Sequence, residues 1–113
     1  MKSYNGFTPK QRYAGLAIVK QAIADGRLKP IKECSCTFCG QDRGIRQYHS
    51  EDYTPERIVD QVIPLCWRCH MMLHSRFSHP LSWEKYKVEV DGGKRFDPVY
   101  RHDWSKLDEH MID

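Results

Sequence analysis

The chain has 113 residues, of which 40% are hydrophobic and 29% are charged, and its formal net charge is +3. This length and composition predict one small domain over residues 1–113 with a modest core, and no segment is apolar for long enough to cross a bilayer, which excludes an integral membrane protein. The small positive charge permits nucleic-acid binding without requiring it.

The cysteine count indicates a reducing compartment. Five cysteines are an odd number, and no apolar stretch follows Met1-Lys2-Ser3 as it would in a secretory leader. Both observations argue against a secreted disulfide protein. We therefore expect a cytoplasmic protein.

The first predicted element is a helix over residues 8–26. Thr8 is suited to its N-cap, Pro9 to its first position, and Gln11 to the return hydrogen bond of a capping box, while Gly26 supplies the C-terminal stop. Apolar residues three and four positions apart should form its buried stripe, namely Leu16, Val19 and Ile23. Such a stripe is more simply core packing than a partner-binding face.

Two CxxC pairs follow, Cys36-Thr37-Phe38-Cys39 and Cys66-Trp67-Arg68-Cys69. Four thiolates at this spacing are typical of a tetrahedral structural Zn²⁺ site, and Gly40 lets the backbone curl over the first pair as a zinc knuckle. The alternative is four buried free thiols. Cys34 could replace Cys36 as a ligand, although the CxxC-Gly register favours Cys36.

Between and after the pairs, the pattern predicts a hairpin and then a helix. Residues 45–53 and 57–65 have strand-like content, with a loop at Thr54-Pro55. A helix should then run from His70 to about Phe77. It places His70 and His74 on one face, where they could bind a second metal ion. The alternatives are ordinary helix histidines, or His70 replacing a cysteine in the structural set.

The last part of the chain, residues 81–113, is predicted as a helical extension. Ser82 should cap a helix that ends at Gly92-Gly93, and Asp103 should cap a short final helix. Each helix should present one apolar face to the body of the protein, formed by Trp83, Tyr86 and Val90 in the first and by Trp104, Leu107 and Met111 in the second. The aromatic residues also offer surfaces for a homodimer or a protein partner.

The motif around the second CxxC pair resembles that of a known family. CxxC-Gly, a strand bearing His49, Gln61 nine residues before His70, and Cys66-x-x-Cys69-His70-x-x-x-His74 are together similar to the HNH (His-Me finger, ββα-metal) endonucleases of the four-cysteine, zinc-stapled type. The resemblance covers about residues 36–76. It implies an α+β fold in which a zinc-stabilised treble-clef core over 34–77, a short hairpin plus a helix, is flanked by N- and C-terminal helices.

The resemblance also implies a metal-dependent protein that acts on nucleic acid, as a DNA endonuclease or nickase. His70 and His74 match the family's helix ligands of a catalytic divalent ion, which would be Mg²⁺, Mn²⁺, Ni²⁺ or Zn²⁺. Gln61 stands where the family has the Asn that holds the base or its loop, and it can make the same amide hydrogen bonds with one more methylene.

Two registers are open for His49. In the preferred one, His49 is the third metal ligand and Ser50 occupies the position of the general base, where an unassisted hydroxyl cannot act near neutral pH. In the other, His49 is the base and Tyr48 stands at the ligand position. Glu51 and Asp52 are further candidates for the base; along a strand, Glu51 shares the orientation of His49 and Asp52 that of Ser50.

The departures at Ser50 and Gln61 favour a competing hypothesis from the same lineage. The protein would be a catalytically inactive treble-clef zinc module that binds nucleic acid or a protein partner. A purely structural zinc scaffold is a third class, which predicts neither DNA affinity nor a second metal ion.

Overall fold

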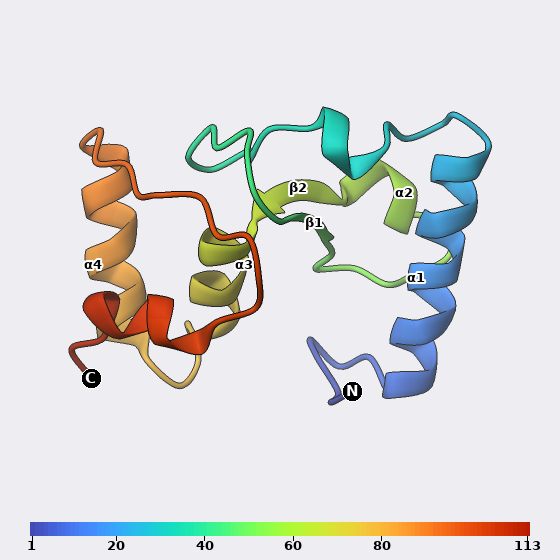
Figure 1. Cartoon of the computed structure of the whole chain (residues 1–113). Helices are drawn as coiled ribbons and strands as arrows, with labels where there is room; N and C mark the ends of the chain where they lie inside the picture. Colours follow the sequence, from blue (N-terminus) through green and yellow to red (C-terminus); the bar gives the residue numbers. More distant parts are fainter. The chain divides into compact units, whose positions relative to one another are not determined.

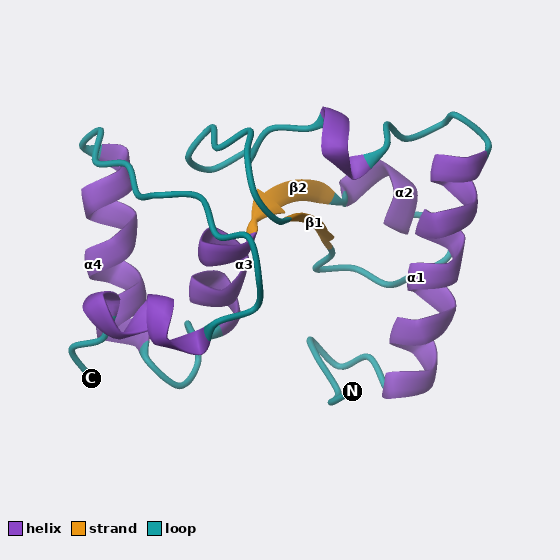
Figure 2. Cartoon of the chain, in the orientation of Figure 1, coloured by secondary structure: helices purple, strands orange, loops and turns teal.

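A computed structural model describes residues 1–113 (Figure 1). Helices dominate, and the one sheet is the antiparallel hairpin β1–β2 (Figure 2). The elements in chain order are α1 (Pro9–Ala24), η1 (Ile31–Glu33), β1 (Arg46–His49), α2 (Ile58–Gln61), β2 (Ile63–Cys66), α3 (Trp67–His74), α4 (Pro80–Asp91) and η2 (Trp104–His110). The predicted mixed α+β class is confirmed. None of the helices has the length and apolar character needed to cross a membrane.

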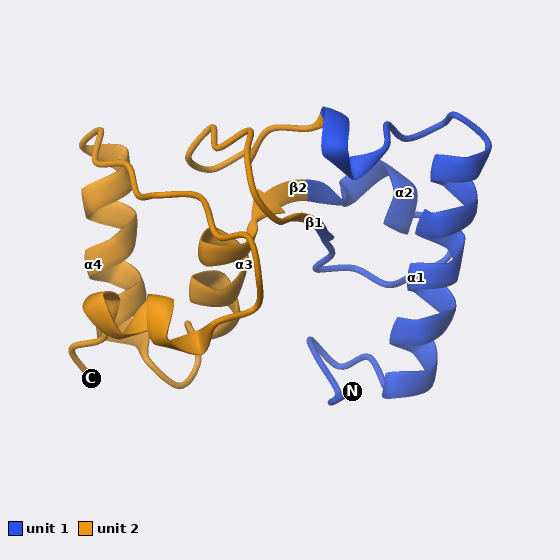
Figure 3. Ribbon diagram, in the orientation of Figure 1, with its two compact units in different colours: residues 1–33, 48–63 blue, residues 34–47, 64–113 orange.

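The chain forms two compact units, which Figure 3 distinguishes by colour. Unit 1 comprises Met1–Glu33 and Tyr48–Ile63, and unit 2 comprises Cys34–Gln47 and Pro64–Asp113. Each unit has its own apolar core. The boundary passes through both strands of the hairpin. A single domain over residues 1–113 stays a prediction.

Unit 1 is organised around α1, whose predicted start is confirmed. The Thr8 side chain accepts from the backbone N–H of Gln11, and the Gln11 side chain accepts from the backbone N–H of Thr8, which completes a capping box. At the other end, Gly26 adopts the left-handed conformation with φ of +80° directly after the Asp25 cap. These bonds lie within a few residues of one another, so local sequence determines both ends of the helix.

The predicted buried stripe of α1 is partly wrong. Leu16 is 37% exposed, and the residues buried along the helix are Gly15, Val19 and Ala22. Gly15 lies at the closest approach, because a Cβ atom added there would come within 2.7 Å of Ile58 Cδ1. The helix therefore packs through its smallest side chain, which turns Leu16 away from the core.

The predicted second strand is wrong over its first half. Residues Ile58–Gln61 form the short helix α2, and only Ile63–Cys66 pair with β1. The turn after Thr54 starts this helix, since the Thr54 carbonyl accepts from the N–H of Ile58 at 2.9 Å. The first strand is also shorter than predicted and ends at His49. Beyond it, the backbone N–H groups of Glu51 and Asp52 donate to the Gln61 side chain and not to a neighbouring strand.

Unit 2 packs α3, α4 and η2 around a core that includes fully buried Trp67 and Met72. Helix α3 begins at Trp67 and ends at His74, three residues earlier at each end than the predicted helix from His70 to Phe77. Its earlier start has a local cause, because the Cys66 sulfur caps the helix by accepting from the N–H of Cys69.

The predicted cap at Ser82 is wrong, because α4 begins at Pro80. Ser82 lies inside the first turn and is fully buried. The carboxylate of Asp113 accepts from the backbone N–H groups of Leu81 and Ser82 at 2.8 and 3.0 Å, so the helix is capped by a residue distant in sequence. The predicted cap at Asp103 is confirmed, and the helix that follows it is the 3₁₀ helix η2.

Candidate metal centres

The four cysteines of the two CxxC pairs converge in unit 2. Their sulfur atoms all lie within 4.8 Å of one another, and Cys39 Sγ is 3.7 Å from Cys66 Sγ. None of the chain's cysteines is in a disulfide. The cluster contains Cys36 and not Cys34, as the CxxC-Gly register favours.

The two pairs have the same local geometry. The N–H of Cys39 donates to Cys36 Sγ at 3.4 Å, and the N–H of Cys69 donates to Cys66 Sγ at 3.4 Å. Gly40, with φ of +82°, donates its N–H to the Cys36 carbonyl and closes the first turn. Backbone N–H groups aimed at sulfur stabilise thiolates, and four sulfurs around one point match the ligand set of tetrahedral Zn²⁺. The donor set therefore fits a structural zinc ion.

The four sulfurs lie close enough to one another to compete for protons. The pKa of Cys36 is lowered by hydrogen bonds, first from Cys39 and then from Cys66 and Cys69. The pKa values of Cys66 and Cys69 are raised, and the hydrogen bond of each with Cys36 is the main cause. The hydrogen bond with Cys36 raises the pKa of Cys39, but those with Cys66 and Cys69 outweigh it and leave the value at about 7. A bound dication removes this competition, because it neutralises the negative charge of the thiolates.

A residue outside the cysteine motif contacts the cluster. The hydroxyl oxygen of Tyr86, on α4, lies 3.0 Å from Cys69 Sγ, and both side chains are 1% exposed. The sequence predicted Tyr86 as a core residue from its helical spacing. No sequence signal indicates that its hydroxyl reaches a sulfur atom, because the contact depends on how α4 packs in unit 2.

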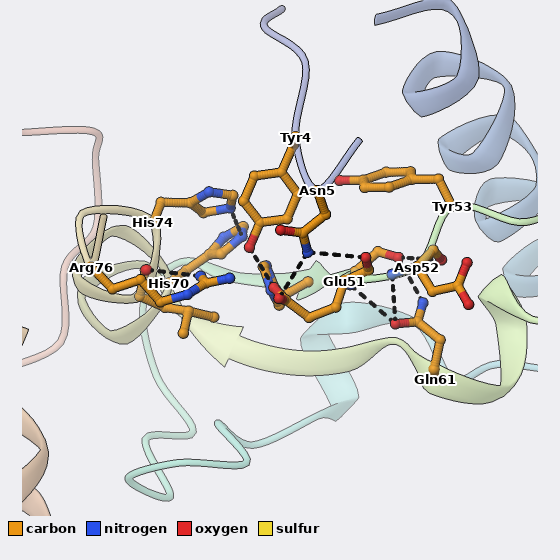
Figure 4. A network of polar contacts seen from close by, with 12 residues as sticks. Tyr4, Asn5, Glu51, Asp52, Tyr53, Gln61, His70, His74 and Arg76 are labelled. Carbon is orange, nitrogen blue, oxygen red and sulfur yellow. Dashed lines mark hydrogen bonds and ion pairs between the residues drawn. The ribbon is translucent and has the colours of Figure 1, made fainter. Parts of the chain in front are cut away.

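A pair of histidines lies on α3, directly after the second CxxC pair. His70 Nε2 and His74 Nε2 are 3.1 Å apart, as expected for side chains one turn apart on the same face (Figure 4). His70 Nδ1 lies 2.8 Å from the side-chain oxygen of Gln47. Since that oxygen can only accept, it places the proton of His70 on Nδ1 and the lone pair on Nε2, toward His74.

Gln47 is a site residue that the sequence analysis missed. A histidine that binds metal through one ring nitrogen usually donates the N–H of its other ring nitrogen to an acceptor, as His70 does to Gln47. A sequence signal for it exists, because Gln47 lies two residues before His49 on β1 and strand periodicity puts both on the same face.

His49 belongs to unit 1, where its ring is buried with 3% exposure. Its Nε2 contacts the Glu51 carboxylate, which also accepts from the Tyr4 hydroxyl and from the Asn5 amide (Figure 4). Burial raises the pKa of Glu51, but the hydrogen bonds from Tyr4, Asn5 and His49 outweigh it and lower the value to about 2. Glu51 is therefore a carboxylate at neutral pH. It lies beside His49 as predicted, although β1 ends at His49 and the contact is made across the bend that follows the strand.

Gln61 fixes the loop that follows β1. Its side-chain oxygen accepts from the N–H groups of Glu51 and Asp52 at 3.1 and 3.2 Å, and its amide nitrogen donates to Ser50 Oγ at 2.6 Å (Figure 4). Buried Ser50 in turn donates its hydroxyl to the Asp52 carbonyl at 2.8 Å. Ser50 and Gln61 thus hold residues 50–52 in one conformation.

Comparisons of the chain with protein-family models, curated proteins and solved structures found no match.

Proposed function

We propose that the protein is an HNH-like, metal-dependent protein that acts on nucleic acid, with DNA as its substrate and nicking or cleavage as its reaction. The observation that carries the proposal is the convergence of His70 Nε2 and His74 Nε2 to 3.1 Å on the helix that the second CxxC pair begins. In a treble-clef core, the zinc ion would hold the start of α3, and so set the position of both imidazoles.

By the resemblance, His70 and His74 would bind the second ion, with His49 as the third ligand in the preferred register; each of the three carries an imidazole nitrogen that can donate to a metal. Three neutral nitrogen donors suit Ni²⁺ and Zn²⁺ better than Mg²⁺, which prefers oxygen ligands, and Mn²⁺ lies between. Such an ion, when bound, supplies Lewis-acid stabilisation of the negative charge that develops on a phosphoryl oxygen. The chain's own part is to orient the ligands, through Gln47 at His70 and Glu51 at His49.

Glu51 serves both registers of His49. Where His49 is a ligand, the carboxylate orients its ring and increases its basicity. Where His49 is the base, the same carboxylate stabilises the imidazolium that forms when His49 takes a proton from water. In the register where His49 is a ligand, Ser50 stands at the base position but is unsuited to it, because its hydroxyl is held between Gln61 and Asp52.

The alternative is a catalytically inactive zinc module that binds nucleic acid or a protein partner through the same surface. The loop contacts of Ser50 and Gln61 favour it, because both residues make hydrogen bonds that support the fold and need no catalytic role.

A plasmid-nicking assay with zinc-loaded protein in Mg²⁺, Mn²⁺ or Ni²⁺ tests the proposal. The His70→Ala variant should lose nicking, as should wild type in EDTA. The His102→Ala variant should retain it, because His102 is exposed and outside both donor sets. If folded wild type does not nick DNA, the nuclease proposal is refuted. Salt-dependent DNA binding without nicking would then support the inactive module, because phosphate contacts release counterions.

A further inference from the structure

The C-terminal extension contributes a hydrogen-bond donor to the cysteine cluster. Tyr86 lies on α4, beyond the motif that resembles the HNH core, and its hydroxyl oxygen is 3.0 Å from Cys69 Sγ. With both residues 1% exposed, no bulk water competes for the sulfur. A hydrogen bond in such a setting is stronger than the same bond in water.

The direction of this hydrogen bond follows from the protonation states. A tyrosine hydroxyl keeps its proton near neutral pH and can donate it to an acceptor within hydrogen-bond distance. A cysteine bound to zinc has no proton to give. The Tyr86 O–H is therefore the donor and the Cys69 thiolate the acceptor.

The ring of Tyr86 is held on several sides. Phe96 stacks on it with a centroid distance of 5.6 Å and an interplanar angle of 16°, and His110 meets it edge-on at 4.9 Å. Trp83 and Phe38 also stack with it, each at 6.1 Å. These contacts orient the ring, so that the direction of its hydroxyl is determined by the packing of unit 2.

We propose that Tyr86 is a positioning residue of the zinc site, which donates its O–H to the Cys69 thiolate and thereby slows both zinc loss and electrophilic attack on that sulfur. A hydrogen bond withdraws electron density from sulfur and lowers its nucleophilicity. The inference concerns the structural centre. It holds whether the protein cleaves nucleic acid or only binds it, so its failure and the failure of the proposed function are separate results.

Tyr86→Phe tests the proposal, because it removes the hydroxyl and keeps the ring. With Co²⁺ in place of Zn²⁺, the sulfur-to-cobalt charge-transfer band should move to lower energy, since the sulfur becomes more electron-rich. Zinc affinity should fall roughly 10-fold, the lower end of the usual effect of losing such a partner. Tyr53→Phe is the matched control, because it removes another buried hydroxyl, one bonded to Arg12 in unit 1. Its cobalt spectrum should equal that of wild type.

A second measurement, the rate of alkylation at each cysteine, separates this hydrogen bond from a role of Tyr86 in ring packing alone. In zinc-loaded Tyr86→Phe, alkylation by iodoacetamide should accelerate at Cys69 and not at the other three ligands, as mapped by mass spectrometry. Equal acceleration at all four cysteines, or a wild-type cobalt spectrum, overturns the proposal. If Tyr86→Phe fails to fold, 3-fluorotyrosine at position 86 provides the test. Its more acidic phenol is a stronger donor and should move the band to higher energy, and an unchanged band overturns the proposal.

Discussion

Replacing Cys66 by alanine should unfold unit 2. Cys66 is 7% exposed and has two roles, because its sulfur belongs to the cysteine cluster and also caps α3. Structural zinc contributes on the order of 10 kcal/mol to folding in zinc-finger peptides. Small proteins are stable by only about 5–15 kcal/mol in total, so losing even half of the zinc contribution matches the lower end of that range. The lost helix cap adds about 1 kcal/mol.

Tryptophan fluorescence reports on this unit selectively, because the three tryptophans of the chain, Trp67, Trp83 and Trp104, all lie in unit 2. We expect Cys66→Ala to show the emission of exposed tryptophan at 25 °C and to contain no stoichiometric zinc. Wild type treated with a strong chelator should behave in the same way. Hydrogen exchange of the α1 amides would follow unit 1 separately.

Cys34→Ala is the matched control for this experiment. Cys34 is half-buried and lies outside the sulfur cluster, so its variant should bind stoichiometric zinc and unfold within about 1 kcal/mol of wild type. The reasoning is refuted if Cys66→Ala retains stoichiometric zinc, or if it unfolds in urea with the same free energy as Cys34→Ala.

Three further predictions concern stability. Gly15→Ala should destabilise the protein by about 1 kcal/mol in urea, because the clash of the new Cβ with Ile58, 2.7 Å away, costs more than the helix propensity gained; a more stable variant would contradict this. Thr8→Ala should cost about 1 kcal/mol in the same assay through the lost capping box, and an unchanged midpoint would show that the cap is not stabilising. Burial and then the charge of Arg68 lower the pKa of His110 in the folded state, so the unfolded chain binds the proton more readily. The free energy of unfolding should therefore fall as the pH drops below about 6.5. His110→Gln should make this fall less steep, and an equally steep fall in both proteins would show that His110 is not its cause.

Some of the structure could be predicted because its causes are local. The capping box of Thr8 and Gln11 joins residues three apart, and Gly26 ends the same helix through its own backbone conformation. The CxxC spacing likewise brings each sulfur onto the backbone N–H of its own turn. The pairing of His70 with His74 follows from such short-range geometry. The convergence of the two CxxC pairs, with Cys39 and Cys66 27 residues apart, was predicted from the zinc-ligand motif.

Other features depended on contacts between segments distant in the chain, and the sequence does not show which of these segments meet. The start of α4 is set by Asp113, about thirty residues away, and the close packing at Gly15 is set by Ile58. The strand expected at residues 58–61 became a helix, because burial of Ile58 and the Thr54 turn outweighed its β-branched content.

The hydrogen-bond partners of the candidate metal ligands also depend on contacts between distant segments. The sequence by itself determined which residues could bind metal, since ligand chemistry and CxxC spacing are properties of short segments. Only the tertiary structure decided that the Tyr86 hydroxyl reaches Cys69 and that the Gln47 amide reaches His70. The physical reason is that a hydrogen bond requires two atoms to approach within about 3 Å, and for residues 17 or 23 positions apart only the packing of whole elements brings them that close.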